Sequence, residues 1–242
     1  MHVPDGFFDA PSSIATGAAA AGTLAVGLKL AGRDLDDRLT PMAGLVAAFV
    51  FALQMLNFPV ASGTSGHLLG GALAAVLVGP WVGMVSVSIV LVVQALLFAD
   101  GGLSALGFNV VLIAIIPSLV GYGVFVVLRS VLPSGRSAVV AAAALAAAVS
   151  VPVAAAAFAV LFAVGGQVDL DFTSVLGAMV GTHVLIGVGE AIITGAVISA
   201  VIGTRPDLVY GAHTLVADVE VRTPVLAGNE TGAASSRRRR HA

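Results

Sequence analysis

The longest stretch of this sequence without a charged side chain is residues 41–99, PMAGLVAAFVFALQMLNFPVASGTSGHLLGGALAAVLVGPWVGMVSVSIVLVVQALLFA. One helical membrane span needs roughly 20 apolar residues, so this run is long enough for several crossings. Stretches without charge also occur at 101–128, 137–168 and 172–189. Only 10% of all side chains are charged, whereas soluble domains have about 25%. The runs lack the alternating polarity of β-barrel strands. The sequence therefore predicts an all-α polytopic membrane protein.

Two natural breaks divide the long run, one at Pro59–Gly66 and one at Gly79-Pro80. With these breaks we expect seven transmembrane helices. The third is short, roughly 21 Å at 1.5 Å per residue, against a hydrocarbon layer of about 30 Å. The expected spans are 11–31, 41–57, 66–79, 81–99, 103–128, 137–164 and 173–202.

Basic residues occur in only three regions, at 29–38, at 129–136 and from Arg205 onward. Positive charge favours the cytoplasmic side of a membrane. Seven spans place all three regions on that side, with the N-terminus outside and the C-terminus inside, whereas six spans would misplace one region. We therefore expect a multi-pass protein of the cell membrane.

The chain divides by composition into a membrane domain, residues 1–206, and a polar tail, 207–242, that we expect to be cytoplasmic and disordered. The tail ends in SSRRRRHA. Because anionic lipid attracts clustered arginines, Arg237–Arg240 are interpreted as reinforcing orientation at the bilayer. We expect no nucleic-acid partner.

The N-terminus offers an unusual set of nitrogen donors. The α-amine of Met1, the backbone nitrogen of His2 and Nδ1 of its imidazole can close a five-membered and a six-membered ring around one ion. Three nearly coplanar nitrogens suit Ni(II) or Cu(II) rather than tetrahedral zinc. A histidine at position 2 is a weak signal alone, since a solvated terminus is the ordinary alternative.

The expected topology strengthens this hypothesis because it places His67 on the same side as Met1. His67 lies in SGTSGHLLGG, where glycines let another backbone approach closely. Its imidazole is a candidate fourth nitrogen. The alternative is a histidine at a helix end that is bonded to a carbonyl.

Other polar residues of the predicted spans are candidates because polar groups inside a bilayer are costly. His183 and Glu190 lie seven residues apart on one face of the last span, where a structural hydrogen bond between helices competes with a metal relay. Asn57 and Ser65 are candidates for a supporting or structural role. Gln54, Gln94 and Asn109 are expected to form interhelical hydrogen bonds.

Two absences limit the function. The sequence has no GxxxxGK[ST] phosphate loop and no HExxH or comparable hydrolytic set. It also has no cysteine, which excludes thiolate ligands and disulfides. We therefore expect no enzyme activity, no catalytic cofactor, and ATP hydrolysis by another polypeptide if transport uses ATP.

Several long motifs resemble the CbiM/NikM family, the substrate-capturing components of energy-coupling factor transporters for cobalt and nickel. The similarity covers about residues 1–208 in matching order. The motifs are MHVPDGF at 1–7, QMLNFPVASGTSGHLLGGALAAVLVGPW at 54–81, VQALLFADGGLSALGFNV at 93–110 and GTHVLIGVGEAIIT at 181–194.

The resemblance implies that the transported Ni(II) or Co(II) is held by the Met1 amine, both nitrogens of His2 and the imidazole of His67. It implies that the N-terminal segment tucks into the helical bundle from outside. It further implies three kinds of partner: a coupling transmembrane subunit, a small accessory membrane subunit and cytoplasmic ATPases.

Two other functions remain open at this stage. One is a self-sufficient ion-coupled carrier in which Glu190 and His183 form a proton relay, and the other is a membrane scaffold. Uptake that depends on a separate ATPase would favour the substrate-capturing role over the carrier and the scaffold. The sequence does not choose between nickel and cobalt, because the same four nitrogens bind either ion.

Overall fold

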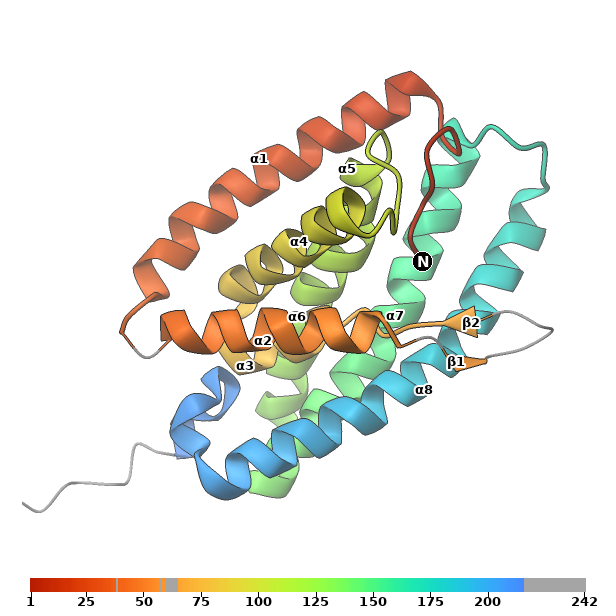
Figure 1. The fold of residues 1–242 in the computed structure, drawn as a ribbon. Coiled ribbons are helices and arrows are strands. Elements are labelled where there is room, and N and C mark those ends of the chain that lie inside the picture. Colours follow the sequence, from red (N-terminus) through yellow and green to blue (C-terminus); the bar gives the residue numbers. More distant parts are fainter. Residues whose placement is uncertain (38, 57, 60–64, 216–242) are drawn as a thin grey trace, which may run out of the picture.

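The computed structural model describes residues 1–37, 39–56, 58–59 and 65–215, which form a bundle of helices with one short β-hairpin (Figure 1). Each of the seven predicted spans contains a helix. The hairpin pairs β1 (Phe58–Pro59) with β2 (Ser65–Gly66). The helices are α1 (Ala10–Asp34), α2 (Leu39–Gln54), α3 (Gly71–Val78), α4 (Pro80–Leu97), α5 (Leu106–Asn109), α6 (Ile116–Val131), α7 (Arg136–Gly165) and α8 (Phe172–Thr204).

Local sequence explains how several helices begin. The carboxylate of Asp9 accepts a hydrogen bond from Ser12 N at 2.8 Å, and proline occupies the first turn of α1. Asp171 caps α8 in the same way through Ser174 N. Both aspartates therefore fix helix starts at the same end of the bundle.

The fifth predicted span is one helical stretch in three parts. A π-helical segment, Val110–Ile115, joins α5 to α6, and Ile116 N donates to Val111 O. Pro117 follows directly and has no N–H to donate, so the regular α-helical ladder is interrupted there. The whole stretch Leu106–Val131 is nevertheless long and apolar enough to cross a membrane.

The third predicted span, 66–79, is only partly helical. Helix begins at Gly71, and its eight residues extend about 12 Å. Residues 66–70 are non-helical instead and are buried throughout. Non-helical backbone at membrane depth is tolerated where it is buried in protein. The prediction that this element is short was correct, but the prediction of helix over 66–70 was wrong.

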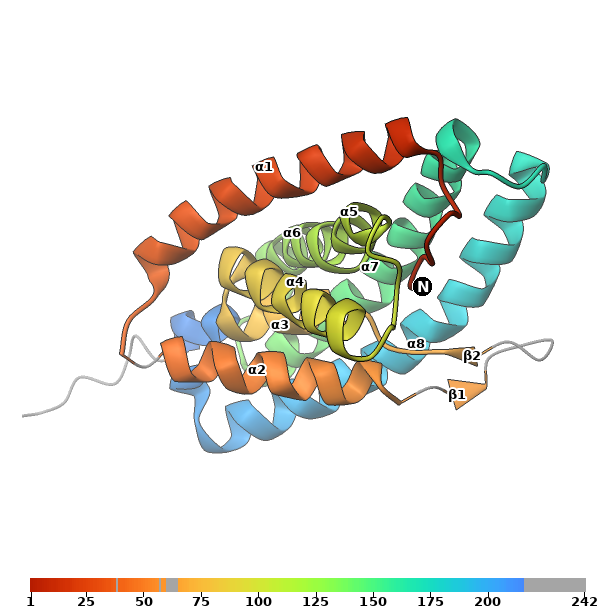
Figure 2. The ribbon, with the colours of Figure 1, turned by 45° about the horizontal axis from the view of Figure 1, so that its top comes forward.

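Five helical stretches of the described chain are long and apolar enough to cross a membrane, and α2 is a shorter apolar helix. The long helices α7 and α8 pack closely, because a Cβ on Gly187 would lie 2.8 Å from Ala148 O. Helix α3 lies in the interior of the bundle, where all of its residues are buried (Figure 2). The core is thus built from small and branched apolar side chains.

The two ends of the bundle carry different connections. One end gathers the N-terminal residues 1–9 with the segments 98–105 and 166–171. The other end gathers the connection after α1 with the residues after α8 (Figure 1). The prediction that the first end faces outside stays a prediction.

The packed part of the chain extends past the predicted domain boundary at residue 206. Two 3₁₀ turns, Pro206–Leu208 and Tyr210–Leu215, follow α8. Val209 and Ala212 are buried between them and the helices. Residues 216–242, including Arg237–Arg240, lie outside the described residues, so the prediction of a disordered tail stays untested there.

Candidate metal centre

The N-terminal segment is held inside the bundle by backbone hydrogen bonds. Val3 N donates to Asn109 Oδ1 at 2.7 Å, and Val3 O accepts from Gly102 N at 2.8 Å. The side chain of Val3 is only 1% exposed. Asn109 was expected to bond between helices. Its amide instead binds both backbone groups of Val3, since Nδ2 also donates to Val3 O.

Further contacts fix the residues that follow. Asp5 Oδ1 accepts from Ser104 Oγ at 2.6 Å and from Ser104 N at 2.7 Å, and these bonds hold the pKa of Asp5 below its ordinary value. Phe8 forms a β-bridge with Gly166, and its ring stacks on Phe108 with centroids 3.8 Å apart. The segment is therefore anchored at three places, which fixes the position of Met1.

The Met1 amine lies 3.0 Å from Nε2 of His67. Nδ1 of His67 lies 2.8 Å from Leu68 O, and a carbonyl only accepts hydrogen bonds, so Nδ1 carries the proton. Nε2 then has a free lone pair directed at the amine. This tautomer is the one that a histidine needs in order to bind a metal through Nε2.

His2 stacks on His67, with ring centroids 4.8 Å apart and an angle of 16° between the planes. Its Nδ1 lies 2.9 Å from Asp100 Oδ1. The chelate expected from the sequence uses this same Nδ1, so binding requires the imidazole to turn from the carboxylate of Asp100 toward the amine. A cavity of about 430 Å³, lined in part by His2, Asp5 and Asp100, lies beside the ring.

Burial keeps the nitrogen donors neutral. It lowers the pKa of the Met1 amine from 8.0 to about 6, and nearby Asp100 only partly opposes this effect. Burial, together with the charge of the N-terminal amine, lowers the pKa of His2 to about 4. Near pH 7 both groups are therefore largely unprotonated, the form that binds a metal ion.

The distance between the Met1 amine and His67 Nε2 can be compared with one edge of a planar set of four nitrogens. In such a set the amine and Nδ1 of His2 are opposite each other, so a fourth ligand is adjacent to the amine. With metal–nitrogen bonds of about 2 Å, adjacent ligands lie about 2.8–3.0 Å apart. The separation between the amine and His67 Nε2 is 3.0 Å. Within the described residues, no group of three or more His, Cys, Asp or Glu side chains converges on a metal position.

Two of the remaining candidates, Glu190 and His183, bond to backbone groups. Both oxygens of Glu190 accept backbone N–H groups, from Leu69 and Gly70, which agrees with its structural interpretation. His183 Nδ1 bonds to Met179 O within its own helix. Asn57 lies outside the described residues. Ser65 belongs to β2, where only its backbone is described.

Sequence reasoning missed the role of Asp100 and misassigned that of Asn109. A local signal for Asp100 exists, because it is the first charge after the uncharged run 41–99. Its approach to His2 depends on the fold of the N-terminal segment. Gly102 adds to this fit, since a Cβ there would lie 2.3 Å from Asp5 N.

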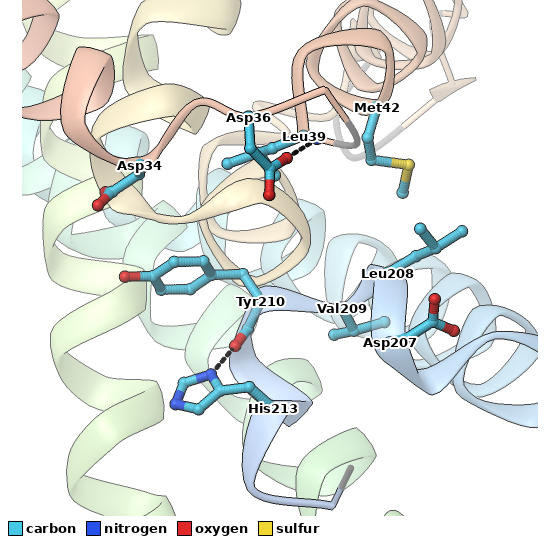
Figure 3. Close-up of a pocket in the computed structure, with 9 residues that line it drawn as sticks. All are labelled: Asp34, Asp36, Leu39, Met42, Asp207, Leu208, Val209, Tyr210 and His213. Carbon is cyan, nitrogen blue, oxygen red and sulfur yellow. Dashed lines mark hydrogen bonds between the residues drawn. The ribbon is translucent and has the colours of Figure 1, made fainter. Parts of the chain in front are cut away.

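A second cavity lies at the opposite end of the bundle (Figure 3). Its volume is about 470 Å³, and it contains His213. The Nδ1 of His213 bonds to Tyr210 O of the same turn, and the side chain is exposed. The cavity does not include any of the predicted metal ligands. Its lining residues are Asp34, Asp36, Leu39, Met42, Asp207, Leu208, Val209, Tyr210 and His213.

Comparison with known proteins gives consistent matches. The family model described as cobalt uptake substrate-specific transmembrane region matches residues 2–208. The cobalt transport protein CbiM of Sorangium cellulosum is 34% identical over 86% of this chain and 94% of its own length. The fused nickel transport protein NikMN of Rhodobacter capsulatus is 38% identical over 52% of this chain and 36% of its own length.

The fold also matches an experimental structure. A crystal structure of a truncated transition metal transporter superposes with a TM-score of 0.76 at 30% sequence identity. The match covers 84% of this chain and 99% of that one. The likeness thus extends over nearly all of the described membrane domain.

Proposed function

Since this chain belongs to the family of cobalt uptake substrate-specific transmembrane regions, we propose that it captures Ni(II) or Co(II) outside the cell for an ATP-driven transporter of the energy-coupling factor type. The chain is a multi-pass membrane protein of metal transport. The proposal rests chiefly on the Met1 amine, which lies 3.0 Å from His67 Nε2 beside the stacked ring of His2.

Each donor has a distinct role in this proposal. The Met1 amine, the backbone nitrogen of His2 and His2 Nδ1 form the two chelate rings, and His67 Nε2 completes the plane. The backbone nitrogen loses its proton when the ion binds, whereas the amine is already neutral for the most part. The buried site thus replaces the hydration of the ion with four fixed nitrogens.

Release and energy supply are assigned to other polypeptides. The chain has no phosphate-binding loop of the GxxxxGK[ST] type. We propose that cytoplasmic ATPases act through a coupling transmembrane subunit, with a small accessory membrane subunit as a third partner. ATP-dependent uptake should therefore need these partners in the same membrane.

The first experiment measures metal bound to the purified chain with its native N-terminus. We expect one Ni(II) or Co(II) per chain by elemental analysis, with the absorption spectrum of a planar nitrogen site for nickel. His2→Ala and His67→Ala should each abolish tight binding. His213→Ala is the matched control, because this histidine lies at the opposite end and should not matter. Full binding by the His67→Ala variant would contradict the proposed site.

A further inference from the structure

The non-helical segment 66–70 has an unusual position for backbone without regular secondary structure. It lies between β2 and α3, all of its residues are buried, and it carries His67. Buried backbone groups must find hydrogen-bond partners, because an unpaired group costs about 1–3 kcal/mol. The partners of this segment therefore hold one of the proposed metal ligands in place.

Two side chains from distant helices supply these partners. The carboxylate of Glu190, on α8, accepts Leu69 N at 2.8 Å through Oε2 and Gly70 N at 2.9 Å through Oε1. Gln54, on α2, donates from Nε2 to Leu69 O at 2.7 Å. Both side chains are almost fully buried. Leu69 is thus fixed through its N–H by α8 and through its carbonyl by α2.

The local backbone is shaped to present both N–H groups to one carboxylate. Gly70 has a φ of 78°, a conformation that side-chain-bearing residues rarely adopt. A Cβ on Gly70 would lie 2.8 Å from the side chain of Val50. Glycine therefore allows the backbone to turn into α3. Glu190 accepts hydrogen bonds from the two N–H groups at this turn.

A short chain of bonds connects this clamp to the metal ligand. Leu68 O and Leu69 N belong to the same peptide group, and Leu69 N donates a hydrogen bond to Glu190. Leu68 O in turn accepts Nδ1 of His67, which sets the direction of Nε2 toward the Met1 amine. Movement of the 68–70 backbone would therefore rotate or displace the imidazole.

We propose that Glu190 is a positioning residue for metal capture, acting through the backbone of Leu69 and Gly70 on the orientation of His67. This inference rests on the proposed function, since it assumes that His67 binds the ion. A carboxylate is required because only it offers two acceptors on one side chain without any donor. Glu190 does not touch the ion in this arrangement.

The test is Glu190→Gln in the full-length chain with its native N-terminus, titrated with Ni(II) in detergent. The carboxamide keeps one acceptor but directs an NH₂ donor at the second N–H. Loss of a group that orients a metal ligand weakens binding roughly 10- to 100-fold. We expect this loss together with a shifted absorption band of bound nickel, because the geometry of His67 changes.

Thr194→Val is the matched control. Thr194 is fully buried one turn further along α8, and its hydroxyl has no hydrogen-bond partner in the described structure. Its replacement should leave both affinity and spectrum unchanged. Equal losses in the two variants would overturn the proposal, because they would reflect a general disturbance of α8. An unchanged affinity and spectrum for Glu190→Gln would overturn it as well.

A second variant covers the case in which Glu190→Gln does not fold, judged by its thermal unfolding and elution profile. Gln54→Met removes only the bond to Leu69 O, and a smaller loss of affinity with a shifted nickel band is expected. No change in either would overturn the proposal. If the unmodified chain binds no metal, the proposed function itself fails, and this outcome is distinct from every result of the variants.

Discussion

The two ends of the helical bundle both contain a histidine, aspartates and a cavity, yet they differ in how the nitrogen-bearing groups are held. The cavities are similar in size, about 430 Å³ beside His2 and about 470 Å³ beside His213. At the first end the imidazoles are stacked and the Met1 amine lies against one of them. At the second end His213 is exposed and bonds within its own turn.

This comparison shows that anchoring, rather than open volume or acidity, distinguishes the candidate site. Residues 1–9 are fixed by contacts to Asn109, Gly102 and Gly166, so the ligands lose their freedom when the chain folds. Preformed ligands avoid that cost when the ion binds. The following experiments change the anchoring or the donors at the first end, and the last one changes the opposite end.

The largest effect is expected from a short extension, such as Gly-Ser, placed before Met1. It converts the amine into an amide, which removes one of the proposed nitrogen donors. Tight metal binding, followed by competition with a chelator, should disappear while the thermal unfolding of the chain changes little. The same two residues added after Ala242 serve as the control, and equal binding by both extended chains would contradict the model.

Gly102→Ala should come next, with a loss of affinity of about 100-fold or less. The new Cβ would lie 2.3 Å from Asp5 N, so the N-terminal segment must shift outward. Nickel titration measures the effect. Gly22→Ala on α1 is the matched control, because its Cβ meets nothing within 4 Å. A Gly102→Ala chain with normal affinity would show that the segment tolerates displacement.

Asn109→Ala should weaken binding by about tenfold, which corresponds to about 1.4 kcal/mol. The change removes both side-chain bonds to Val3 while the bond from Gly102 N to Val3 O remains. Limited proteolysis should detect a looser N-terminus in the same variant. Unchanged affinity and protection would mean that the remaining anchors suffice.

The protons released on binding give a smaller but well-defined difference. In a free peptide of residues 1–9 at pH 7, the amine with its ordinary pKa near 8 and the backbone nitrogen together release about two protons. In the protein the pKa of the amine is about 6. The amine is then already neutral, so about one proton is released.

Below pH 6 the amine becomes protonated, so the number of protons released should rise and the metal affinity should fall. Calorimetry in buffers of different ionisation enthalpy measures the count, and equal counts for peptide and protein would contradict burial of the amine.

The smallest effect is expected at the opposite end. Asp34→Asn lies in the lining of the cavity beside His213 and should leave nickel affinity unchanged. Equilibrium titration against the unmodified chain checks this. A clear loss of affinity would show that the two ends are coupled and would remove the contrast on which the site assignment depends.

Local pattern was enough to predict most of the helices. Uncharged length located a helix in each of the predicted spans. The pattern failed at 66–70, because an apolar stretch with glycines is compatible both with a helix and with buried non-helical chain. Glu190, more than a hundred residues away, decides between them by accepting the N–H groups of Leu69 and Gly70. A local pattern contains no information about such a partner.

The candidate site shows the same division. The sequence by itself determined the donor chemistry, because a free amine followed by His2 can chelate a planar ion in any conformation that brings the nitrogens together. Only the tertiary structure decided that His67 Nε2 meets the amine, that Asp100 holds His2, and that Asn109 anchors Val3. The physical reason is that chelate rings depend on covalent connectivity. Approach across the bundle depends instead on the packing of helices and on the pairing of buried polar groups.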